Sequence, residues 1–115
     1  MAKIEISNVR DEESKPKVED GRLVLYVGKS AVLFHDQITN VDVGCVITIP
    51  DGYVGVVTPY DNFIEMSSVL IEGNGLVRGT LTHLRVRKGT PGAVKLRSKD
   101  AVATLILIKV EDIEL

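Results

Sequence analysis

The sequence has 115 residues, of which 44% are hydrophobic, and this length suits one domain with one core. Fourteen Lys and Arg residues against sixteen Asp and Glu residues give a formal net charge of −2 at pH 7. That balance gives no electrostatic footprint for nucleic acid or an anionic membrane, so neither is expected as a partner. We interpret the densest basic cluster, Arg85, Arg87 and Lys88, as a solvated strand edge, because alternate residues of a strand share a face.

Cysteine usage points to a reducing compartment. Cys45 is the one cysteine, so no intrachain disulfide is expected, and residues 1–5 lack the apolar run of a secretory signal. We therefore expect a cytoplasmic or virion protein. Because Cys45 lies in the apolar run 43–47, it is predicted to be a buried small hydrophobe and not a nucleophile.

The N-terminal third predicts short strands around one charged loop. Residues 3–9 alternate apolar and polar side chains, which is the period of a half-buried strand. Residues 10–21 are charged and contain Pro16, which predicts an exposed loop; a charged binding arm is the alternative. The apolar runs 23–27 and 31–34, joined by a short turn, predict two neighbouring strands.

The middle of the chain carries a strong turn signal. Residues 41–49 and 53–59 are rich in β-branched side chains and flank Pro50, Asp51 and Gly52. Proline supplies a fixed φ angle and glycine a positive one, so this segment predicts a tight hairpin turn. In the following residues 61–67, one turn of helix would fit, and nowhere else does the spacing favour a helix.

The C-terminal half continues the pattern of short strands. Strands are expected over residues 68–72, 76–86, 93–97 and 101–110. The last of these is the most apolar run, but it is too short to cross a bilayer as a helix, and its Val, Ile and Thr content favours a buried strand. Such regular spacing is typical of an all-β sandwich, jelly roll or barrel, with no membrane span.

Catalytic and metal-binding patterns are missing from the residues. His35 and His83 stand far apart, and neither belongs to a cluster with the spacing of metal ligands, so no metal and no cofactor is expected. Four aspartates fall at strand ends or turns, where they accept backbone hydrogen bonds and need no catalytic role: Asp36, Asp42, Asp51 and Asp61. No glycine-rich phosphate loop precedes a helix.

Residues 43–59, Val-Gly-Cys-Val-Ile-Thr-Ile-Pro-Asp-Gly-Tyr-Val-Gly-Val-Val-Thr-Pro, resemble a motif of the trimeric dUTPase and dCTP deaminase superfamily. The order of further similar segments matches that family: 3–6, 59–62, 76–81 and 99–106. The resemblance covers nearly the whole chain, 1–115, mostly through structural residues. It implies a dUTPase-like, distorted jelly-roll barrel of short, mostly antiparallel strands.

The functional positions of that family are not kept. Tyr60 and Asp61 stand where the family has the Arg and Ser that hold phosphates, and an aspartate repels phosphate. Asn74 is the nearest candidate for the catalytic Asp in a shortened uridine-binding hairpin, and an amide cannot act as a general base. Thr104 replaces the final Gln, Arg22 occupies the region of the first motif's Asp, and residues 111–115 do not resemble the family's glycine-rich tail.

The resemblance therefore implies a homotrimeric scaffold without catalytic residues, and Tyr60, Asp61, Asn74 and Thr104 are degenerate site positions. Our leading hypothesis is a structural protein, such as a capsid decoration protein whose partner is a viral capsid protein. One alternative is a regulatory module that binds a nucleotide or a protein. Another is a divergent dUTP hydrolase or dCTP deaminase.

Overall fold

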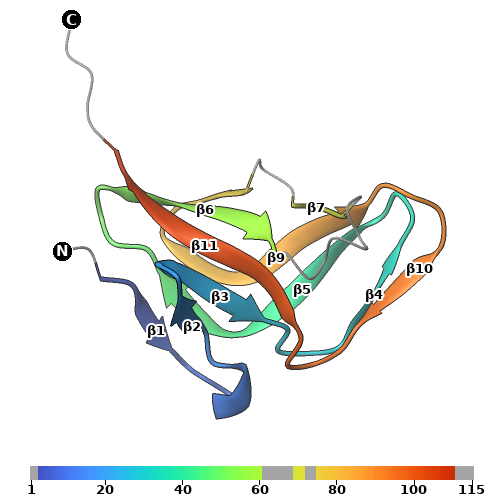
Figure 1. Ribbon diagram of the computed structural model, residues 1–115, viewed down its shortest axis with the longest axis horizontal. Helices are drawn as coiled ribbons and strands as arrows, with labels where there is room; N and C mark the ends of the chain where they lie inside the picture. The colour runs from blue at the N-terminus through green and yellow to red at the C-terminus, as the bar shows by residue number, and fades with distance from the viewer. Residues whose placement is uncertain (1–2, 61–68, 72–74, 111–115) are drawn as a thin grey trace, which may run out of the picture.

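The computed structural model describes residues 3–60, 69–71 and 75–110, with residues 69 and 70 described in their backbone alone. Within these residues the chain is almost entirely β-structure, as the sequence predicts (Figure 1). The strands are β1 (Glu5–Ser7), β2 (Lys17–Glu19), β3 (Arg22–Tyr26), β4 (Ala31–Phe34), β5 (Ile38–Thr48), β6 (Tyr53–Pro59), β7 (Val69–Ile71), β8 (Leu76–Val77), β9 (Thr80–Lys88), β10 (Ala93–Leu96) and β11 (Ala101–Lys109). One short 3-10 helix, η1, covers Glu12–Ser14.

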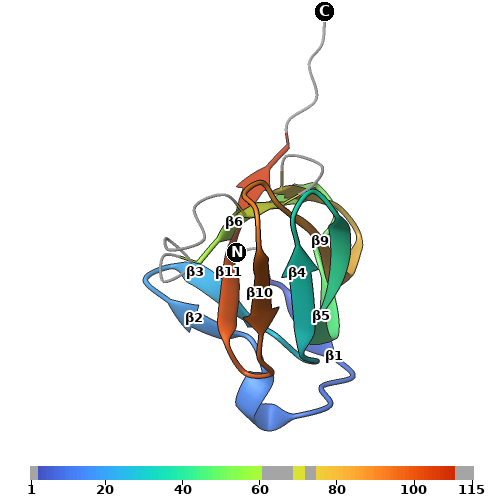
Figure 2. The same ribbon diagram turned by 90° about the vertical axis from the view of Figure 1, so that its right-hand side faces the viewer.

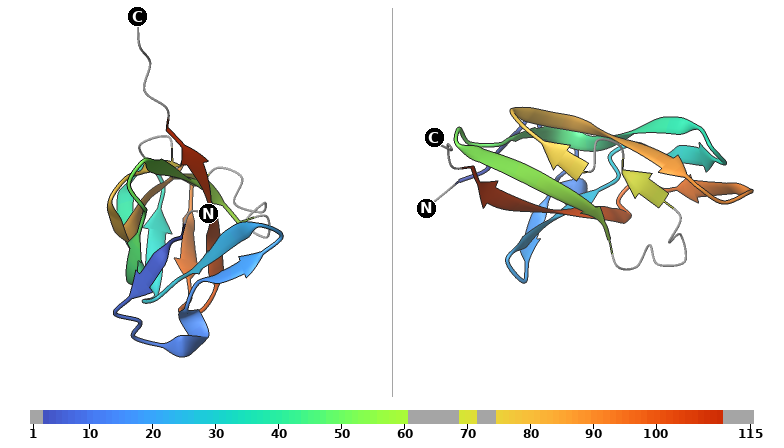
Figure 3. Two further views of the ribbon diagram at one scale, coloured as in Figure 1. Left: turned by 90° about the vertical axis from the view of Figure 1, so that its left-hand side faces the viewer. Right: turned by 90° about the horizontal axis from the view of Figure 1, so that it is seen from above.

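The described strands form two main layers and a small third sheet. One layer has the order β1-β5-β9-β7 and the other the order β2-β3-β11-β6-β8; β4 pairs with β10. Seen from above, the β5–β9 layer lies over the β3–β11–β6 layer, with β4 and β10 at one end (Figure 3). Figure 2 shows that end from outside, with the paired strands β4 and β10 nearest the viewer. The expected all-β, distorted jelly-roll architecture is confirmed.

All three sheets supply the core. Alternate side chains of a strand point to the same face, so each short strand can contribute its inward-facing side chains to the core. Its largest fully buried side chains come from β3, β4, β5, β10 and β11: Leu25, Leu33, Ile47, Leu96 and Leu105. Cys45 is buried in the same cluster, as predicted.

Two expected strand pairings are wrong. The turn at residues 50–52 does not close a hairpin, because β5 pairs with β1 and β9 whereas β6 pairs with β11 and β8. Likewise β3 and β4 follow each other in the chain but lie in different sheets. Turn residues reverse the chain locally, but they do not decide which strand pairs with which. The C-terminal strand β11 inserts between β3 and β6 and takes the hydrogen bonds of both.

The segment 10–21, expected as an exposed loop, is mostly exposed but contains regular structure. It begins with η1, in which Asp11 caps the turn by accepting the amide of Glu13. It ends in a hairpin between β2 and β3, whose two turn residues, Asp20 and Gly21, have φ angles of 51° and 75°. Positive φ at both positions is the geometry of a type I′ turn, for which Asp-Gly is a preferred sequence. Asp20-Gly21 is therefore the local signal for this hairpin, within a segment whose charge and Pro16 predict a loop.

The remaining strands agree with the sequence more closely. The predicted strand over 3–9 appears as β1, paired with β5, and the run 101–110 appears as β11. The run 76–86 is divided at Gly79 into β8 and β9, which belong to different layers. The helical turn expected at 61–67 lies outside the described residues. In the part of the chain that is described, no helix has the length and apolar character needed to span a membrane.

Candidate functional site

Tyr60 and Thr104, two of the site positions expected from the family resemblance, lie together on the outward face of the β3–β11–β6 layer. Both line a hollow of about 80 Å³ whose other described walls are Glu19, Asp20, Arg22 and Val24. Strand register explains the meeting, because Thr104 on β11 stands opposite Val24 on β3 and opposite Thr58 on β6. The other two positions, Asp61 and Asn74, lie outside the described residues.

We call this the Tyr60 hollow. Hydrogen bonds between the end of β6 and β11 fix the positions of its walls. The hydroxyls of Thr58 and Thr104 lie 3.0 Å apart, within hydrogen-bonding distance, and Thr104 is only 7% exposed. The backbone amide of Tyr60 donates to the carbonyl of Val102 at 3.0 Å. Because Thr104 is buried and bonded to a neighbouring strand, its hydroxyl already has a structural partner.

The polar groups around the Tyr60 hollow are of mixed charge. Glu19 and Asp20 bring two carboxylates, and Arg22 brings one guanidinium. Nearby, Tyr26 lies beneath the ammonium of Lys17, which is 5.9 Å from the ring centroid. Burial, followed by the negative charge of Glu19, raises the pKa of the Tyr26 phenol. Two carboxylates against one guanidinium leave the residues that line the hollow with a net negative charge, which does not favour a triphosphate.

The Tyr60 hollow is also small. Pockets that bind small molecules usually have volumes of about 300–1,000 Å³, whereas this one measures about 80 Å³. The residues that the structure describes here could hold a water or the tip of one side chain, but not a nucleotide.

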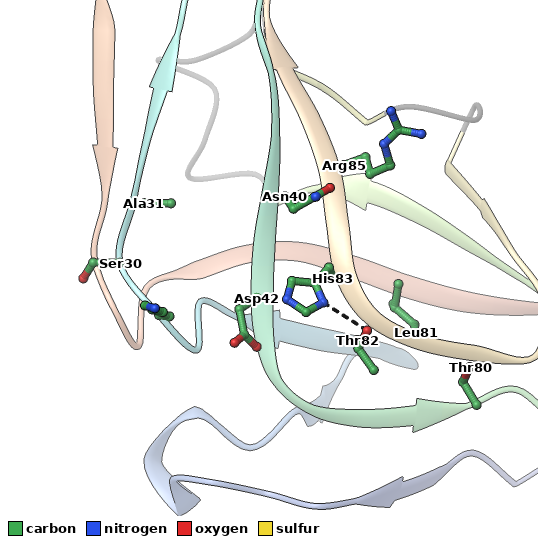
Figure 4. A pocket seen from close by; sticks show the side chains of 10 residues that line it. Ser30, Ala31, Asn40, Asp42, Thr80, Leu81, Thr82, His83 and Arg85 are labelled. Atoms are coloured by element: carbon green, nitrogen blue, oxygen red, sulfur yellow. Dashed lines mark hydrogen bonds between the residues drawn. The ribbon is translucent and has the colours of Figure 1, made fainter.

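A much larger cleft, of about 650 Å³, lies on the outer side of the barrel between β4 and β9 (Figure 4). We call it the β4–β9 cleft. It receives Lys29 and Ser30 from the turn before β4, Asn40 and Asp42 from β5, and His83 and Arg85 from β9. The sequence analysis did not single out this group. One available signal was the segment between Glu72 and Asp100, which contains Arg78, Arg85, Arg87, Lys88, Lys95, Arg97 and Lys99 but no acidic residue.

Asp42 is the best-connected polar side chain of the β4–β9 cleft, with its side chain only 15% exposed. Its Oδ1 accepts a hydrogen bond from the Arg10 guanidinium and another, 2.7 Å long, from the amide of Gly44. The hydrogen bond from Arg10 is the main cause that lowers the pKa of Asp42; burial opposes it, and the Gly44 amide lowers the pKa further. Asp42 accepts a backbone hydrogen bond, as predicted, but it lies inside β5, where the register with β9 shifts, and not at a strand end or turn.

A third hollow, of about 320 Å³, lies beside β8, in the region that resembles the family's uridine-binding hairpin. It is lined by Gly75, Leu76, Val77 and Arg78 together with residues of β9, and it shares His83 and Arg85 with the β4–β9 cleft. Gly75 is fixed there by its surroundings, because a Cβ atom would lie 2.2 Å from the carbonyl oxygen of Val57. Gly75 therefore packs directly on β6.

Among the residues that the structure describes, the remaining reactive side chains do not assemble into a chemical site. Burial is the main cause that raises the pKa of the Cys45 thiol, which lies 3.7 Å from the carbonyl oxygen of Val43. A protonated, buried thiol is a poor nucleophile. The Nδ1 atom of His83 lies 3.0 Å from the hydroxyl of Thr82. In the described ranges, no group of three or more His, Cys, Asp or Glu side chains could hold a metal ion.

Comparison with solved structures finds proteins that share this architecture. The dUTPase of Staphylococcus bacteriophage 80alpha, in a mutant form, superposes with a TM-score of 0.80 and 14% sequence identity, over 98% of this chain and 94% of that one. A mutant dUTPase from phage phi11 of S. aureus gives a TM-score of 0.79 and 15% identity, over 98% and 94% of the two chains. The chain has a dUTPase-like fold. No protein-family model matches the sequence, and no curated protein matches it by sequence.

At such low identity the likeness concerns the dUTPase-like fold and not the chemistry of the phage enzymes. The fold explains why Tyr60 and Thr104, 44 positions apart in the chain, meet across β6 and β11. What the Tyr60 hollow does depends on the side chains present. In this chain those side chains are a phenol, one threonine hydroxyl, a valine and two carboxylates near one arginine.

Proposed function

We propose that this chain is a non-catalytic, homotrimeric scaffold of dUTPase-like fold with a structural role, such as the decoration of a viral capsid. The observation that carries the proposal is the Tyr60 hollow. Its volume of about 80 Å³ and its two carboxylates do not suit a triphosphate, and the hydroxyl of its Thr104 already has Thr58 as a partner. Tyr60, Asp61, Asn74 and Thr104 are accordingly degenerate positions of a former nucleotide site.

Self-association is supported by an apolar patch on the outward face of the same layer. On β11, Leu105 packs in the core, whereas Ile106 and Ile108 point outward and are 40% and 46% exposed. Ile106 stands opposite Val56 of β6, and Val56 in turn stands opposite Leu76 of β8, which is 58% exposed. We call Leu76, Ile106, Ile108 and Val110 the β11 patch.

The β11 patch is a reasonable contact between copies for two reasons. Contiguous exposed apolar surface usually marks an interaction site in a small protein. A chain of this size also buries only a moderate share of its surface by itself, so assembly adds stability. A closed threefold ring would match threefold positions in a capsid lattice.

The first experiment measures the assembly directly. Light scattering coupled to gel filtration at micromolar concentration is expected to give the mass of three 12.5 kDa chains. A monomer under these conditions would contradict the homotrimer.

The second experiment tests for chemistry. The full chain is incubated with each deoxynucleoside triphosphate and Mg²⁺ while product formation and melting temperature are recorded. No turnover and no thermal shift are expected. Turnover would overturn the proposal in favour of a divergent hydrolase or deaminase. A ligand that binds only the folded state raises the melting temperature, so a shift without turnover would overturn it in favour of a nucleotide-binding module.

A regulatory module that binds another protein is the second candidate. It is favoured by the similarity to the dUTPase of bacteriophage 80alpha. Phage dUTPases such as that one control transfer of virulence genes by a proto-oncogenic G protein-like mechanism. If light scattering shows that the chain remains monomeric, the exposed β11 patch would be available to a different protein, and this second candidate would replace the scaffold.

A further inference from the structure

The small sheet of β4 and β10 carries a second exposed apolar surface, separate from the β11 patch. Along β4, Leu33 is fully buried, whereas its neighbours Val32 and Phe34 point outward and are 39% and 50% exposed. The register places Lys95 of β10 opposite Val32 and Ala93 opposite Phe34, so these four side chains share the outward face. We call Val32, Phe34, Ala93 and Lys95 the β4–β10 face.

The β4–β10 face is open among the described residues. Figure 2 looks onto this sheet, and no other described strand lies in front of β4 and β10. The β11 patch belongs to the layer β2-β3-β11-β6-β8, so the two apolar surfaces lie on different sheets. Adjacent exposed apolar side chains mark interaction sites, and aromatic side chains are enriched in protein–protein interfaces. Val32 and Phe34 therefore indicate a contact with a protein.

The charges around the β4–β10 face are unevenly placed. Lys95 lies on the face, and Arg97 follows directly after the end of β10. In the part of the chain that is described, neither side chain makes an ion pair. Asp100 is at the same end, where its Oδ2 accepts the amide of Arg97 at 3.1 Å. Two cations against one carboxylate leave this end positive, whereas Asp36 lies in the turn beyond Phe34 at the other end.

We propose that the β4–β10 face docks an acidic, apolar segment of another protein. The apolar side chains of that segment pack on Val32 and Phe34, and its carboxylates pair with Lys95 and Arg97. Burial of apolar surface supplies the affinity, and the two cations select an acidic segment over a basic one. This contact uses neither the Tyr60 hollow nor the β11 patch, so it does not depend on the proposed assembly.

The test is an NMR titration of the isotope-labelled full chain with three hexapeptides: Leu-Leu-Leu-Glu-Glu-Glu, Leu-Leu-Leu-Lys-Lys-Lys and Ser-Ser-Ser-Glu-Glu-Glu. The first peptide is expected to shift the amide signals of β4 and β10 at millimolar concentration, and the other two to bind at least about fivefold more weakly. Absence of shifts on β4 and β10 would overturn the proposal. Equal binding of the lysine peptide would overturn the charge selection, and equal binding of the serine peptide would overturn the apolar contact.

A matched pair of variants locates the apolar contact. Phe34→Ser removes an apolar side chain from the β4–β10 face, whereas Val18→Ser removes one that is 74% exposed on β2, in another sheet. Phe34→Ser is expected to weaken binding of the acidic apolar peptide about tenfold, and Val18→Ser to leave it unchanged. Equal weakening would contradict the site. Both variants should keep the light-scattering mass of the wild type; a lower mass for Phe34→Ser would show that a second copy, and not another protein, covers the face.

A second pair tests the charges. Lys95→Glu should weaken binding of the acidic apolar peptide and strengthen binding of the lysine peptide, because it reverses one charge of the β4–β10 face. Lys15→Glu reverses an exposed charge next to η1 and should change neither. Both side chains are exposed, so both variants should keep the wild-type melting temperature. The same change in affinity for both variants would indicate a general charge effect and contradict the site.

Discussion

The backbones of Gly28 and Gly44 are in direct contact, because a Cβ atom placed on Gly28 would lie 2.4 Å from the Cα atom of Gly44. The amide of Gly28 donates to the carbonyl of Asp42 at 2.7 Å, which fixes the exit of β3 against β5. At this point the register between β5 and β9 shifts, and Gly44 adopts a φ angle of +76°. Two glycines thus join the layers where β5 bulges.

Replacement of Gly28 by alanine is expected to lower the free energy of unfolding by about 3 kcal/mol or more, because the obstructing atoms belong to the backbone and cannot rotate away. Urea unfolding followed by circular dichroism measures this change. Gly21→Ala is the matched control: its φ is +75° but nothing lies within 4 Å of the added Cβ. Gly21→Ala should therefore lower the free energy of unfolding by only about 1–2 kcal/mol, which is the cost of a left-handed φ angle for a residue with a Cβ atom. Equal costs for the two variants would show that the Gly28–Gly44 contact is unimportant.

Asp42 should make stability depend on pH below about 4. Its hydrogen bond with Arg10 lowers its pKa in the folded state below the unfolded value of about 3.9. Ionised Asp42 therefore stabilises the fold above that value, and the contribution is lost as the pH falls through the folded-state pKa. Urea unfolding of the wild type between pH 2.5 and 7 should show this loss.

Asp42→Asn should lower the free energy of unfolding by about 1–2 kcal/mol at pH 7, since the amide is a weaker acceptor for Arg10 and Gly44. The difference from wild type should shrink as the pH falls below 4. The control, Asp51→Asn, lies in the exposed turn at residues 50–52 and should change stability by less than about 0.5 kcal/mol. A difference for Asp42→Asn that stays constant at all pH values would rule out the ion pair as its cause.

The alternation of apolar side chains and the turn residues predicted nearly every described strand, because both signals are local. Pairing is not local. Val24 illustrates this: it is 2% exposed although it points away from the core occupied by Leu23 and Leu25, because Thr104 of β11 is its neighbour across the sheet. Nothing in residues 23–27 indicates that a strand 80 positions later will lie beside them.

The same distinction explains the functional sites. Tyr60 and Thr104 could be singled out because the family resemblance relates distant positions, and the structure brings them to one hollow. The β4–β9 cleft had no such guide, since Lys29 comes from the turn before β4, Asn40 from β5 and Arg85 from β9, and each is an ordinary polar residue in an exposed position. A cleft between unpaired strands becomes visible only when the pairing is known.

The Thr58–Thr104 hydrogen bond should appear as a coupling energy. Thr104→Val and Thr58→Val each leave one hydroxyl without its partner, and we expect Thr58→Val to cost about 1 kcal/mol or more, because it leaves the buried hydroxyl of Thr104 unpaired. In the double variant both hydroxyls are removed, so the total loss should be smaller than the sum of the single losses by about 0.5–1 kcal/mol. Strict additivity in urea unfolding would contradict a direct bond.

The role of the β11 patch can be separated from general surface hydrophobicity by two isoleucines of nearly equal exposure. Ile108, within the patch, is 46% exposed, and Ile38, at the start of β5 in the other layer, is 48% exposed. An aspartate at position 108 would bring a charge into an apolar contact that offers it no partner, which is costly. Ile108→Asp should therefore shift the light-scattering mass from that of three chains towards one, whereas Ile38→Asp should leave the assembly intact. Dissociation by Ile38→Asp alone would instead place the contact between copies on the β5–β9 layer.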